Sequence, residues 1–316
     1  MKTLIVILSL LITACASQTS RTIKDFAIVT NSSAEINQQL ITEYKNSIKE
    51  MQFAHIAKAN PDLNVELNGL GPYIPELSIP TEAEIAQKGV TEKSEQLTAV
   101  NKALLLYSVL LVKLAAAGSV EDINKASTNF STSLTQFNSS LKTTFARQNE
   151  VIDSAQIAAI SSIIDTAAVA SVDYYRNIKI KQVVNDANVM IINIHYFLVN
   201  NLATPGVIGR VYMARRLAFE NEVNDFNKIK KYTLLEQRKD KYIEFDKKQN
   251  ALSEESEHNF RRGLIKNLDN IKEAHQKLTD KVNDNDFSKE NLMILIEQIK
   301  IYVEQYKKFN GSLVTN

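Results

Sequence analysis

Apolar residues recur along most of the chain at intervals of three and four positions, the spacing of helices with one buried face. The most regular run opens at Ser119, with Asp122 three residues on as in a capping box, and continues to Phe145. Its apolar positions are Ile123, Ala126, Phe130, Leu134, Phe137, Leu141 and Phe145. This run predicts the seam of a coiled coil or of an antiparallel bundle.

Comparable patterns predict about seven helices in all. Besides 119–145, the predicted helices cover residues 33–59, 81–117, 150–202, 207–248, 253–282 and 288–309. The segment 150–202 forms one very long helix or two in series. Because several of these helices exceed about 25 residues, or roughly 40 Å, the sequence predicts an all-α fold: an elongated antiparallel helical bundle with coiled-coil-like packing.

Two stretches are apolar enough to raise the question of a membrane. Residues 103–117 are apolar almost all round, but fifteen residues that include Lys113 fall short of the about 20 that a spanning helix needs. Residues 155–172 are rich in small side chains and contain Asp165. Both stretches are therefore predicted to pack against other helices.

Two breaks interrupt the helical pattern. The longer one covers residues 60–80, with prolines at 61, 72, 75 and 80 and glycines at 69 and 71. Loops of this length are uncommon in compact domains unless they have a role, so 60–80 is the preferred exposed contact site. The run Ala203-Thr-Pro-Gly206 marks a possible subdivision of the body near 203–206.

Composition narrows the fold and the class of partner. The 316 residues include only 8 glycines and 5 prolines, which disfavours the many tight turns of a sandwich or a barrel. The formal net charge is +1, without the basic excess of a nucleic-acid-binding protein. No nucleic acid partner is predicted.

The N-terminus has the composition of a secretory signal peptide. Lys2 precedes a ten-residue apolar run over 3–12, which is too short to span a bilayer as a permanent helix. The run ends in Ile12-Thr13-Ala14-Cys15, which resembles the lipobox of bacterial lipoproteins, an aliphatic residue and two small residues before a cysteine. Cys15 is the only cysteine of the chain, so it cannot form an intramolecular disulfide.

The resemblance implies that residues 1–14 are a signal peptide that is removed. The Cys15 thiol would then carry a diacylglycerol through a thioether, with fatty acids such as palmitate, and anchor the protein to a membrane. Residues 15–31 would be the lipidated cysteine and its tether, and residues 32–316 the helical body. An ordinary secretory signal, or a buried apolar N-terminus with an incidental cysteine, is the alternative.

The residue after the cysteine bears on the membrane. In many Gram-negative bacteria an aspartate at that position resembles an inner-membrane retention signal, and this chain has Ala16 there. For a Gram-negative host the resemblance therefore implies the outer membrane, facing the periplasm of the cell envelope.

Catalytic and metal-binding motifs are not recognisable in the sequence. The four histidines, at 55, 195, 258 and 275, lie far apart, and none has the His-Glu-x-x-His spacing of a helical zinc site. We expect packing or surface roles for them, with His195 a hydrogen-bonded core residue. No Gly-x-Ser-x-Gly elbow occurs. The sequence therefore predicts no catalytic residue, no metal ligand and no cofactor.

The glycines and the paired basic residues do not indicate a binding site. The glycines at 69, 71, 206 and 209 lack the pattern of a phosphate-binding loop and are expected in turns. The pairs Arg215-Arg216, Arg261-Arg262 and Lys307-Lys308 are expected on a solvated face rather than against lipid headgroups or an anionic polymer. Tyrosines 232, 242, 302 and 306 are expected at the edge of the core.

Three classes of function follow from these observations. The first is a lipid-anchored cell-envelope protein with a non-enzymatic structural, scaffold or interaction role, whose partner would be another envelope protein. The second is a membrane-active, toxin-like helical protein in which 103–117 and 155–172 insert into a bilayer. The third is an enzyme that lacks a recognisable motif.

Overall fold

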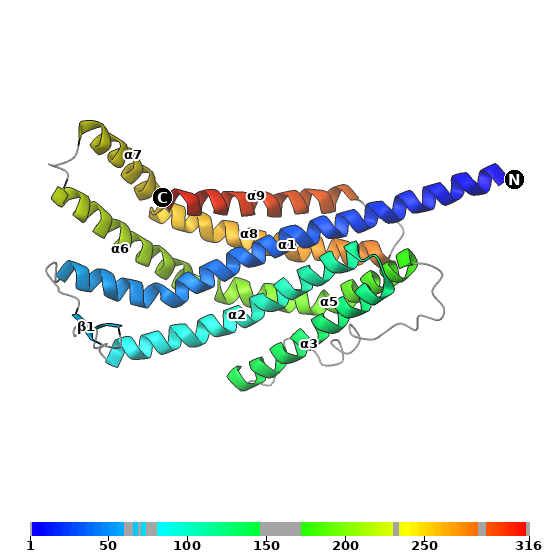
Figure 1. The fold of residues 1–316 in the computed structure, drawn as a ribbon, viewed down its shortest axis with the longest axis horizontal. Coiled ribbons are helices and arrows are strands. Elements are labelled where there is room, and N and C mark those ends of the chain that lie inside the picture. Colours follow the sequence, from blue (N-terminus) through cyan, green and yellow to red (C-terminus); the bar gives the residue numbers. More distant parts are fainter. Residues whose placement is uncertain are drawn as a thin grey trace. The chain divides into compact units, whose positions relative to one another are not determined.

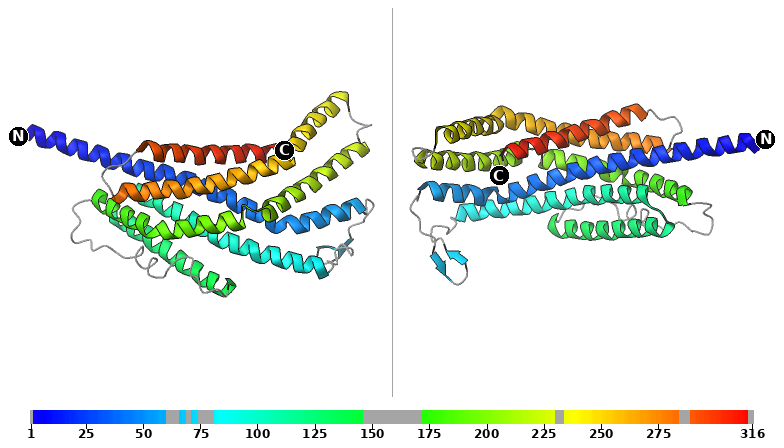
Figure 2. Two further views of the ribbon diagram at one scale, coloured as in Figure 1. Left: turned by 180° about the vertical axis from the view of Figure 1, so that it is seen from behind. Right: turned by 45° about the horizontal axis from the view of Figure 1, so that its top comes forward.

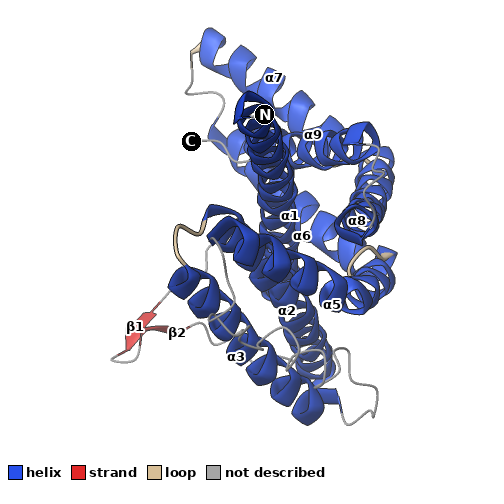
Figure 3. Ribbon diagram, turned by 90° about the vertical axis from the view of Figure 1, so that its right-hand side faces the viewer, coloured by secondary structure: helices blue, strands red, loops and turns tan. Residues whose placement is uncertain are grey.

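The computed structural model describes residues 2–59, 66–68, 71–73, 81–145, 172–229, 234–283 and 289–313. Within these ranges the chain forms eight helices and one two-stranded hairpin (Figure 1, Figure 3). The helices are α1 (Lys2–Ala59), α2 (Thr81–Ala116), α3 (Val120–Phe145), α5 (Val172–Asn201), α6 (Pro205–Ile229), α7 (Leu235–Ala251), α8 (Glu254–Asn283) and α9 (Lys289–Leu313). The predicted all-α helical bundle is confirmed.

The chain divides into two compact units, each made of three separate segments. Unit 1 comprises Met1–Asn37, Thr98–Asn200 and Ile265–Glu304, and unit 2 comprises Gln38–Leu97, Asn201–Leu264 and Gln305–Asn316. Helices α1, α2, α8 and α9 supply residues to both units. One boundary falls between Asn200 and Asn201, close to the possible subdivision at 203–206, whereas the others interrupt these four helices.

In unit 1, α1 runs antiparallel to α2 and to α8, and α5 runs antiparallel to α8. Ser108 donates a hydrogen bond to Asn31, and Asn37 donates one to Asn101. Residue numbers therefore fall along α2 in the direction in which they rise along α1, so these two helices are antiparallel. The same reversal relates α8 to α1 and to α5. The pairs that show it are Ser33 with Asn267, Phe26 with His275, Asn185 with Asn283, and His195 with Asp269.

The seam predicted for α3 is buried wherever its side chains are described. Ile123, Ala126, Phe130 and Leu134 are all less than a tenth exposed. At the start of this helix the backbone N–H of Asp122 donates to the Ser119 hydroxyl, and that hydroxyl donates to the Asp122 carboxylate, as the predicted cap requires. The side chains of Phe137, Leu141 and Phe145 lie outside the described residues.

Helix α1 begins well before the predicted start at residue 33. It runs from Lys2 and includes residues 15–31, which the sequence assigned to a lipidated cysteine and tether. Ile23, Phe26, Ala27 and Thr30 are buried in unit 1. The boundary at residue 32 is therefore wrong, because these residues already carry the spacing of a core-facing helix.

Helix α2 raises the membrane question again. Among the described residues, one segment, Gln87–Ala116, is long and apolar enough to cross a membrane, and half of its most apolar window is buried. In unit 1 the buried residues of this helix include Leu104, Leu111 and Leu114, while Lys113 points to solvent. One face of α2 therefore packs as a core helix, as predicted, although its opposite face is open.

The predicted helix 207–248 is two helices. In unit 2, α6 ends at Ile229 and α7 begins at Leu235, and the two lie alongside each other in both views of Figure 2. Phe226 packs edge-on against Tyr242 and Phe245, with ring centroids 5.6 and 5.3 Å apart. In one continuous helix Phe226 and Phe245 would lie about 28 Å apart. Burying these rings against each other favours a helical hairpin.

Two other predictions for unit 2 are corrected. The connection 60–80 was expected to be irregular, but Glu66–Asn68 and Gly71–Tyr73 form an antiparallel pair, with Asn68 opposite Gly71. The glycines at 206 and 209 were expected in turns, but both lie inside α6. A Cβ at Gly209 would stand 3.2 Å from a carboxylate oxygen of Glu257, so the glycine accommodates the close approach of α8.

The remaining helix ends agree with the sequence. Thr204 caps α6 through a 3.3 Å hydrogen bond from the Val207 N–H, and Pro205 occupies the first turn. Ser253 caps α8 in the same way, accepting from the Ser256 N–H at 3.1 Å. Helices α8 and α9 form a helical hairpin, in which Phe260 near the start of α8 contacts Tyr306 and Phe309 near the end of α9. Residues 146–171, in the first half of the segment 150–202, lie outside the described residues.

Candidate functional site

The residue singled out by the sequence, Cys15, falls within α1. Its side chain is not among those that the structure describes, so its lipidation stays a prediction. Of the predicted contact loop 60–80, only the two short strands are described.

The histidines lie apart from one another. His195 is largely buried and bonds through Nε2 to the carboxylate of Asp269 at 2.7 Å, which confirms the hydrogen bond expected for it. His258 is exposed on α8. His275 is buried on the same helix, and the side chain of His55 lies outside the described residues.

His275 is the centre of a small buried polar group in unit 1. Its Nδ1 lies 3.1 Å from the Tyr107 hydroxyl, and its ring stacks at 6.5 Å on Phe26. Burial lowers the pKa of His275 to about 3 and raises the pKa of Tyr107. Both groups are therefore neutral at ordinary pH, and they join α1, α2 and α8.

Lys179 is the buried cation of unit 1. It lies on α5 with its side chain turned inward, and its Nζ donates to Gln182 at 3.3 Å. Burial lowers its pKa to about 8, although the nearby Asp186 carboxylate acts in the opposite direction. Lys179 lies four residues after Tyr175 and four before Val183, on the buried stripe of α5, so periodicity places it inward although its charge argues for exposure.

Arg215 is the corresponding residue of unit 2. Its Nε and Nη2 each donate to one oxygen of Glu43 at 2.9 Å, and Nη2 also donates to Asn310 at 2.8 Å. Its guanidinium lies 5.2 Å from the centre of the Phe309 ring. The side chain is only 15% exposed. The expectation that the pair Arg215-Arg216 belongs to a solvated face is therefore wrong for Arg215.

The pKa values of the carboxyl groups near Arg215 show the effect of burial. Burial raises the pKa of Glu43 above its usual value, even though the charge and hydrogen bonds of Arg215 act to lower it. Burial likewise raises the pKa of Glu50, with the charge of Glu43 adding to the effect. The pair joins α1, α6 and α9 within unit 2, and its donors and acceptors are used in that contact.

The α6–α7 hairpin is held by a group of four charged side chains. Lys241 and Lys248 of α7 each donate to Glu222 of α6 at 2.7 Å, and both also contact Glu244. Although burial opposes it, the hydrogen bonds from the lysines hold the pKa of Glu222 and of Glu244 below their usual values. These lysines therefore serve the joint between α6 and α7.

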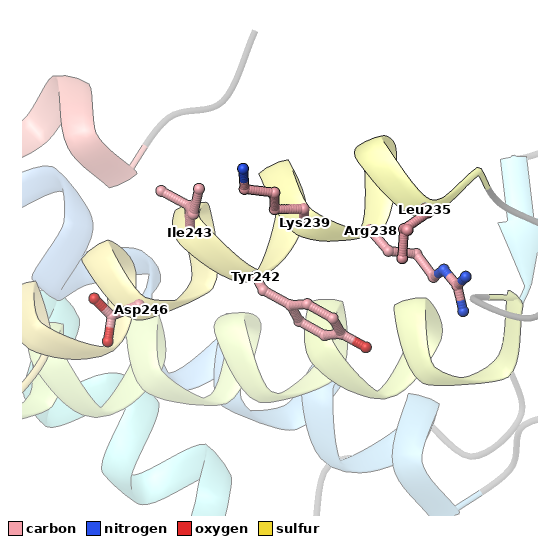
Figure 4. A pocket seen from close by; sticks show the side chains of 6 residues that line it. All are labelled: Leu235, Arg238, Lys239, Tyr242, Ile243 and Asp246. Atoms are coloured by element: carbon pink, nitrogen blue, oxygen red, sulfur yellow. The ribbon is translucent and has the colours of Figure 1, made fainter.

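The opposite side of this hairpin is exposed and apolar. Leu235 is 75% exposed, Leu234 is 71% exposed, and Ile229 at the end of α6 is 56% exposed. A groove of about 460 Å³ runs along α7 (Figure 4). It is lined by Leu235, Arg238, Lys239, Tyr242, Ile243 and Asp246. We call Ile229, Leu234 and the first five of these lining residues the hairpin face.

The hairpin face is basic as well as apolar. Of the residues that line the groove, Arg238 and Lys239 are basic and Asp246 is acidic. Figure 4 shows Lys239 and Ile243 on the side of α7 away from α6, with Tyr242 extended over α6. Exposed aliphatic, tyrosine and basic side chains together are suited to binding a surface rather than to chemistry.

A second groove of about 600 Å³ in unit 2 differs in character. Its lining mixes the cations Arg216, Arg261 and Arg262 with the carboxylates Glu254 and Glu257. Arg216 and Glu257 bind each other at 2.9 Å. Because charges of both signs are interspersed, this groove does not select a ligand of one charge.

Within the described residues, no group of three or more His, Cys, Asp or Glu side chains is placed to hold a metal ion. Comparisons of the chain with protein-family models, with curated proteins and with solved structures find no match in any of the three. The hairpin face is therefore the candidate functional site on structural grounds alone.

Proposed function

We propose that the protein is a bacterial lipoprotein, anchored in the cell envelope through Cys15, whose helical body has a structural, scaffold or interaction role. The observation that carries the proposal is the sequence Ile12-Thr13-Ala14-Cys15, placed directly after an apolar leader and containing the only cysteine of the chain. For a Gram-negative host, Ala16 favours the outer membrane.

The character of the described side chains supports an interaction role. The buried polar groups around His275 in unit 1 and Arg215 in unit 2 join helices to one another. By contrast, the hairpin face presents large apolar side chains to solvent. Apolar surface that is left exposed next to basic residues is typical of a contact surface.

Replacement of Cys15 by serine tests the anchor. Cells would be labelled with a fatty acid, and the protein would be followed through detergent phase separation. Cys15→Ser is expected to abolish the acyl label and to leave an uncleaved precursor, because serine has no thiol to form the thioether. Ser17→Ala, two residues on, is the matched control and should keep both the label and the shorter form. An acylated Cys15→Ser protein would overturn the proposal.

Crosslinking tests the interaction role. A photoreactive amino acid at Leu235 is expected to give adducts in living cells, because this position is exposed on the hairpin face. The same amino acid at Tyr196, which is 71% exposed on α5, is the control. Equal adduct formation at both positions, or at neither, would contradict a specific contact at the hairpin face.

A membrane-active protein is the second candidate, and one observation favours it. The segment Gln87–Ala116 is long and apolar enough to cross a bilayer, and only half of its most apolar window is buried. A protein of this class releases dye trapped in liposomes, whereas an anchored binding protein does not. Dye release at cellular protein concentration would favour the second candidate over the first.

A further inference from the structure

We infer that the hairpin face binds the surface of a phospholipid bilayer that carries negatively charged headgroups. This inference rests on the proposed function in one respect, since it deepens the interaction role by naming the partner. It adds a second membrane contact, made by folded protein in unit 2, to the lipid predicted at Cys15.

The first argument is the exposed apolar surface. Ile229, Leu234 and Leu235 lie at the adjoining ends of α6 and α7, and each is more than half exposed. Large aliphatic side chains at such a position gain free energy when they leave water. A bilayer interface accepts them without a shaped pocket, because its acyl chains rearrange around whatever enters.

The second argument is the charge around that surface. Lys239 is exposed, and Arg238 and Lys239 both line the groove along α7. Long basic side chains place their stems on apolar surface and their charged ends at the level of headgroups. Each basic residue near an anionic bilayer strengthens binding by about fivefold. Arg238 and Lys239 therefore complement such a surface.

The third argument separates these basic residues from the others on α7. Lys241 and Lys248 are bound to Glu222 and Glu244 on the inner side of the hairpin. Lys239 lies on the outer side, away from α6 (Figure 4). The hairpin therefore uses Lys241 and Lys248 for its own structure and displays Lys239 together with leucine, isoleucine and tyrosine side chains. Tyrosine is enriched at membrane interfaces because its ring is apolar and its hydroxyl polar.

The experiment uses the intact lipoprotein with Leu235→Cys, labelled with an environment-sensitive fluorophore and reconstituted in vesicles. If Cys15 is acylated, the new cysteine is the only free thiol, and one fluorophore attaches per chain. The vesicles contain phosphatidylcholine alone or phosphatidylcholine with phosphatidylglycerol. Lipids that quench fluorescence are placed either in the vesicles that hold the protein or in a second, added population.

With phosphatidylglycerol present, the fluorescence is expected to shift to shorter wavelengths. It should also be quenched by lipids in one of the two vesicle populations, either the vesicles that hold the protein or the added ones. Both changes should weaken in phosphatidylcholine alone and at high salt, because salt screens the headgroup charge. Lys239→Gln should lower the ratio of quenched to unquenched fluorophore about fivefold. Lys247→Gln, which changes an exposed lysine of α7 outside the hairpin face, should leave the ratio unchanged.

A fluorophore at Tyr196→Cys provides the positional control, since that residue is as exposed as Leu235 but lies on α5. Absence of quenching at Leu235 in every lipid mixture, or equal quenching at Tyr196, would overturn the inference. Adducts of Leu235 with one specific protein in cells, without lipid quenching, would overturn it in favour of a protein partner. Attachment of a second fluorophore at Cys15 would instead show that the anchor, and with it the proposed function, has failed.

Discussion

The polar residues that matter most to stability are single side chains buried at helix contacts. His275 in unit 1 and Arg215 in unit 2 each touch side chains from two other helices. They differ in charge: burial keeps His275 neutral, whereas Arg215 keeps its charge by binding Glu43 through two parallel hydrogen bonds. Removing either residue should therefore give different and separable effects.

His275 makes the stability depend on pH in a defined direction. Its pKa is about 3 in the folded protein and 6.5 in the unfolded chain. Below pH 6.5 the unfolded chain binds a proton that the folded protein refuses, so stability falls as the pH falls towards 3. Between about pH 7 and about pH 4.5 this histidine alone should remove about 2–3 kcal/mol of unfolding free energy.

The measurement is urea unfolding of the wild type and of His275→Leu at both pH values. The variant should be less stable than the wild type at both pH values. Between about pH 7 and about pH 4.5, however, its unfolding free energy should fall by about 2–3 kcal/mol less than that of the wild type. His258→Gln changes an exposed histidine and serves as the control, with a pH dependence like that of the wild type. Parallel profiles for wild type and His275→Leu would show that His275 is accessible to protons.

Arg215→Met should destabilise unit 2 by about 3–5 kcal/mol, because it leaves the carboxylate of Glu43 buried without its partner. Arg215→Met combined with Glu43→Leu should recover a large part of that loss, since no charge then stays buried. Thermal unfolding of the two single variants and the double variant measures this coupling. Simple addition of the two single losses would mean that the pair is not coupled.

At this scale the sequence predicts apolar burial better than polar burial. The residues Ile36, Leu40, Ile41, Tyr44 and Ile48 are buried as their spacing on α1 predicts. Arg215 was assigned to solvent because its partners lie 172 and 95 residues away, so no local pattern marks them. The exposure of Leu235 was likewise hidden, because an apolar residue in a helical pattern is ordinarily assigned to the core.

At the scale of elements, the α6–α7 hairpin forms because of tertiary contacts rather than because of a local sequence signal. Its two helices are joined by aromatic contacts and by the group of Glu222, Lys241, Glu244 and Lys248. These four charged side chains lie on the inner side of the hairpin and hold its two helices together. The residues of the hairpin face take no part in these ion pairs. The hairpin should therefore lose its order before the rest of unit 2 when this group is weakened.

Lys248→Met tests that expectation, because Lys248 is only 5% exposed and contacts both glutamates. The change should cost about 1–3 kcal/mol and should speed hydrogen exchange in α7 more than in the other helices. Lys247→Met, at the exposed neighbouring position, should change neither quantity appreciably. Uniform acceleration of exchange across all helices would show that the hairpin unfolds only with the whole protein.

Helix existence follows from the sequence more securely than helix ends. Ser119, Thr204 and Ser253 mark helix starts because their caps are local in sequence. The division between α6 and α7 is not marked in the sequence, because residues 230–234 contain neither glycine nor proline. The hairpin of β1 and β2 has a local sequence signal: Asn68 pairs with Gly71, and Gly69 is the first of the two residues between them, a position where glycine is typical of tight hairpin connections.

For the whole molecule, the division into two units cuts across the order of the sequence. Each unit gathers three segments, and the third segment of unit 1, Ile265–Glu304, lies beyond the second segment of unit 2. A single cleavage between residues 38 and 304 therefore leaves neither unit complete. This arrangement makes the possible subdivision near 203–206 a poor place to divide the protein.

Separate expression of residues 21–201 and 202–316 tests this interleaving. Neither fragment should show a cooperative thermal transition, since unit 1 then lacks the buried residues Leu268, Ile271 and His275. Circular dichroism and limited proteolysis measure the outcome. Mixing the two fragments should restore protease resistance. A sharp transition in the isolated 21–201 fragment would show that the first segments of unit 1 suffice.

Helix α1 has a regular stripe of buried positions that continues through both of its parts. The stripe comprises Ile23, Phe26, Ala27, Thr30, Ser33, Ala34, Asn37, Leu40, Ile41, Tyr44, Ser47 and Ile48. One inserted residue would turn every later position by about 100° and expose this stripe to water. An insertion of about seven residues would nearly restore the face. In evolutionary terms, α1 can vary freely in residue type on its exposed side, whereas its length can change only in steps of whole heptads.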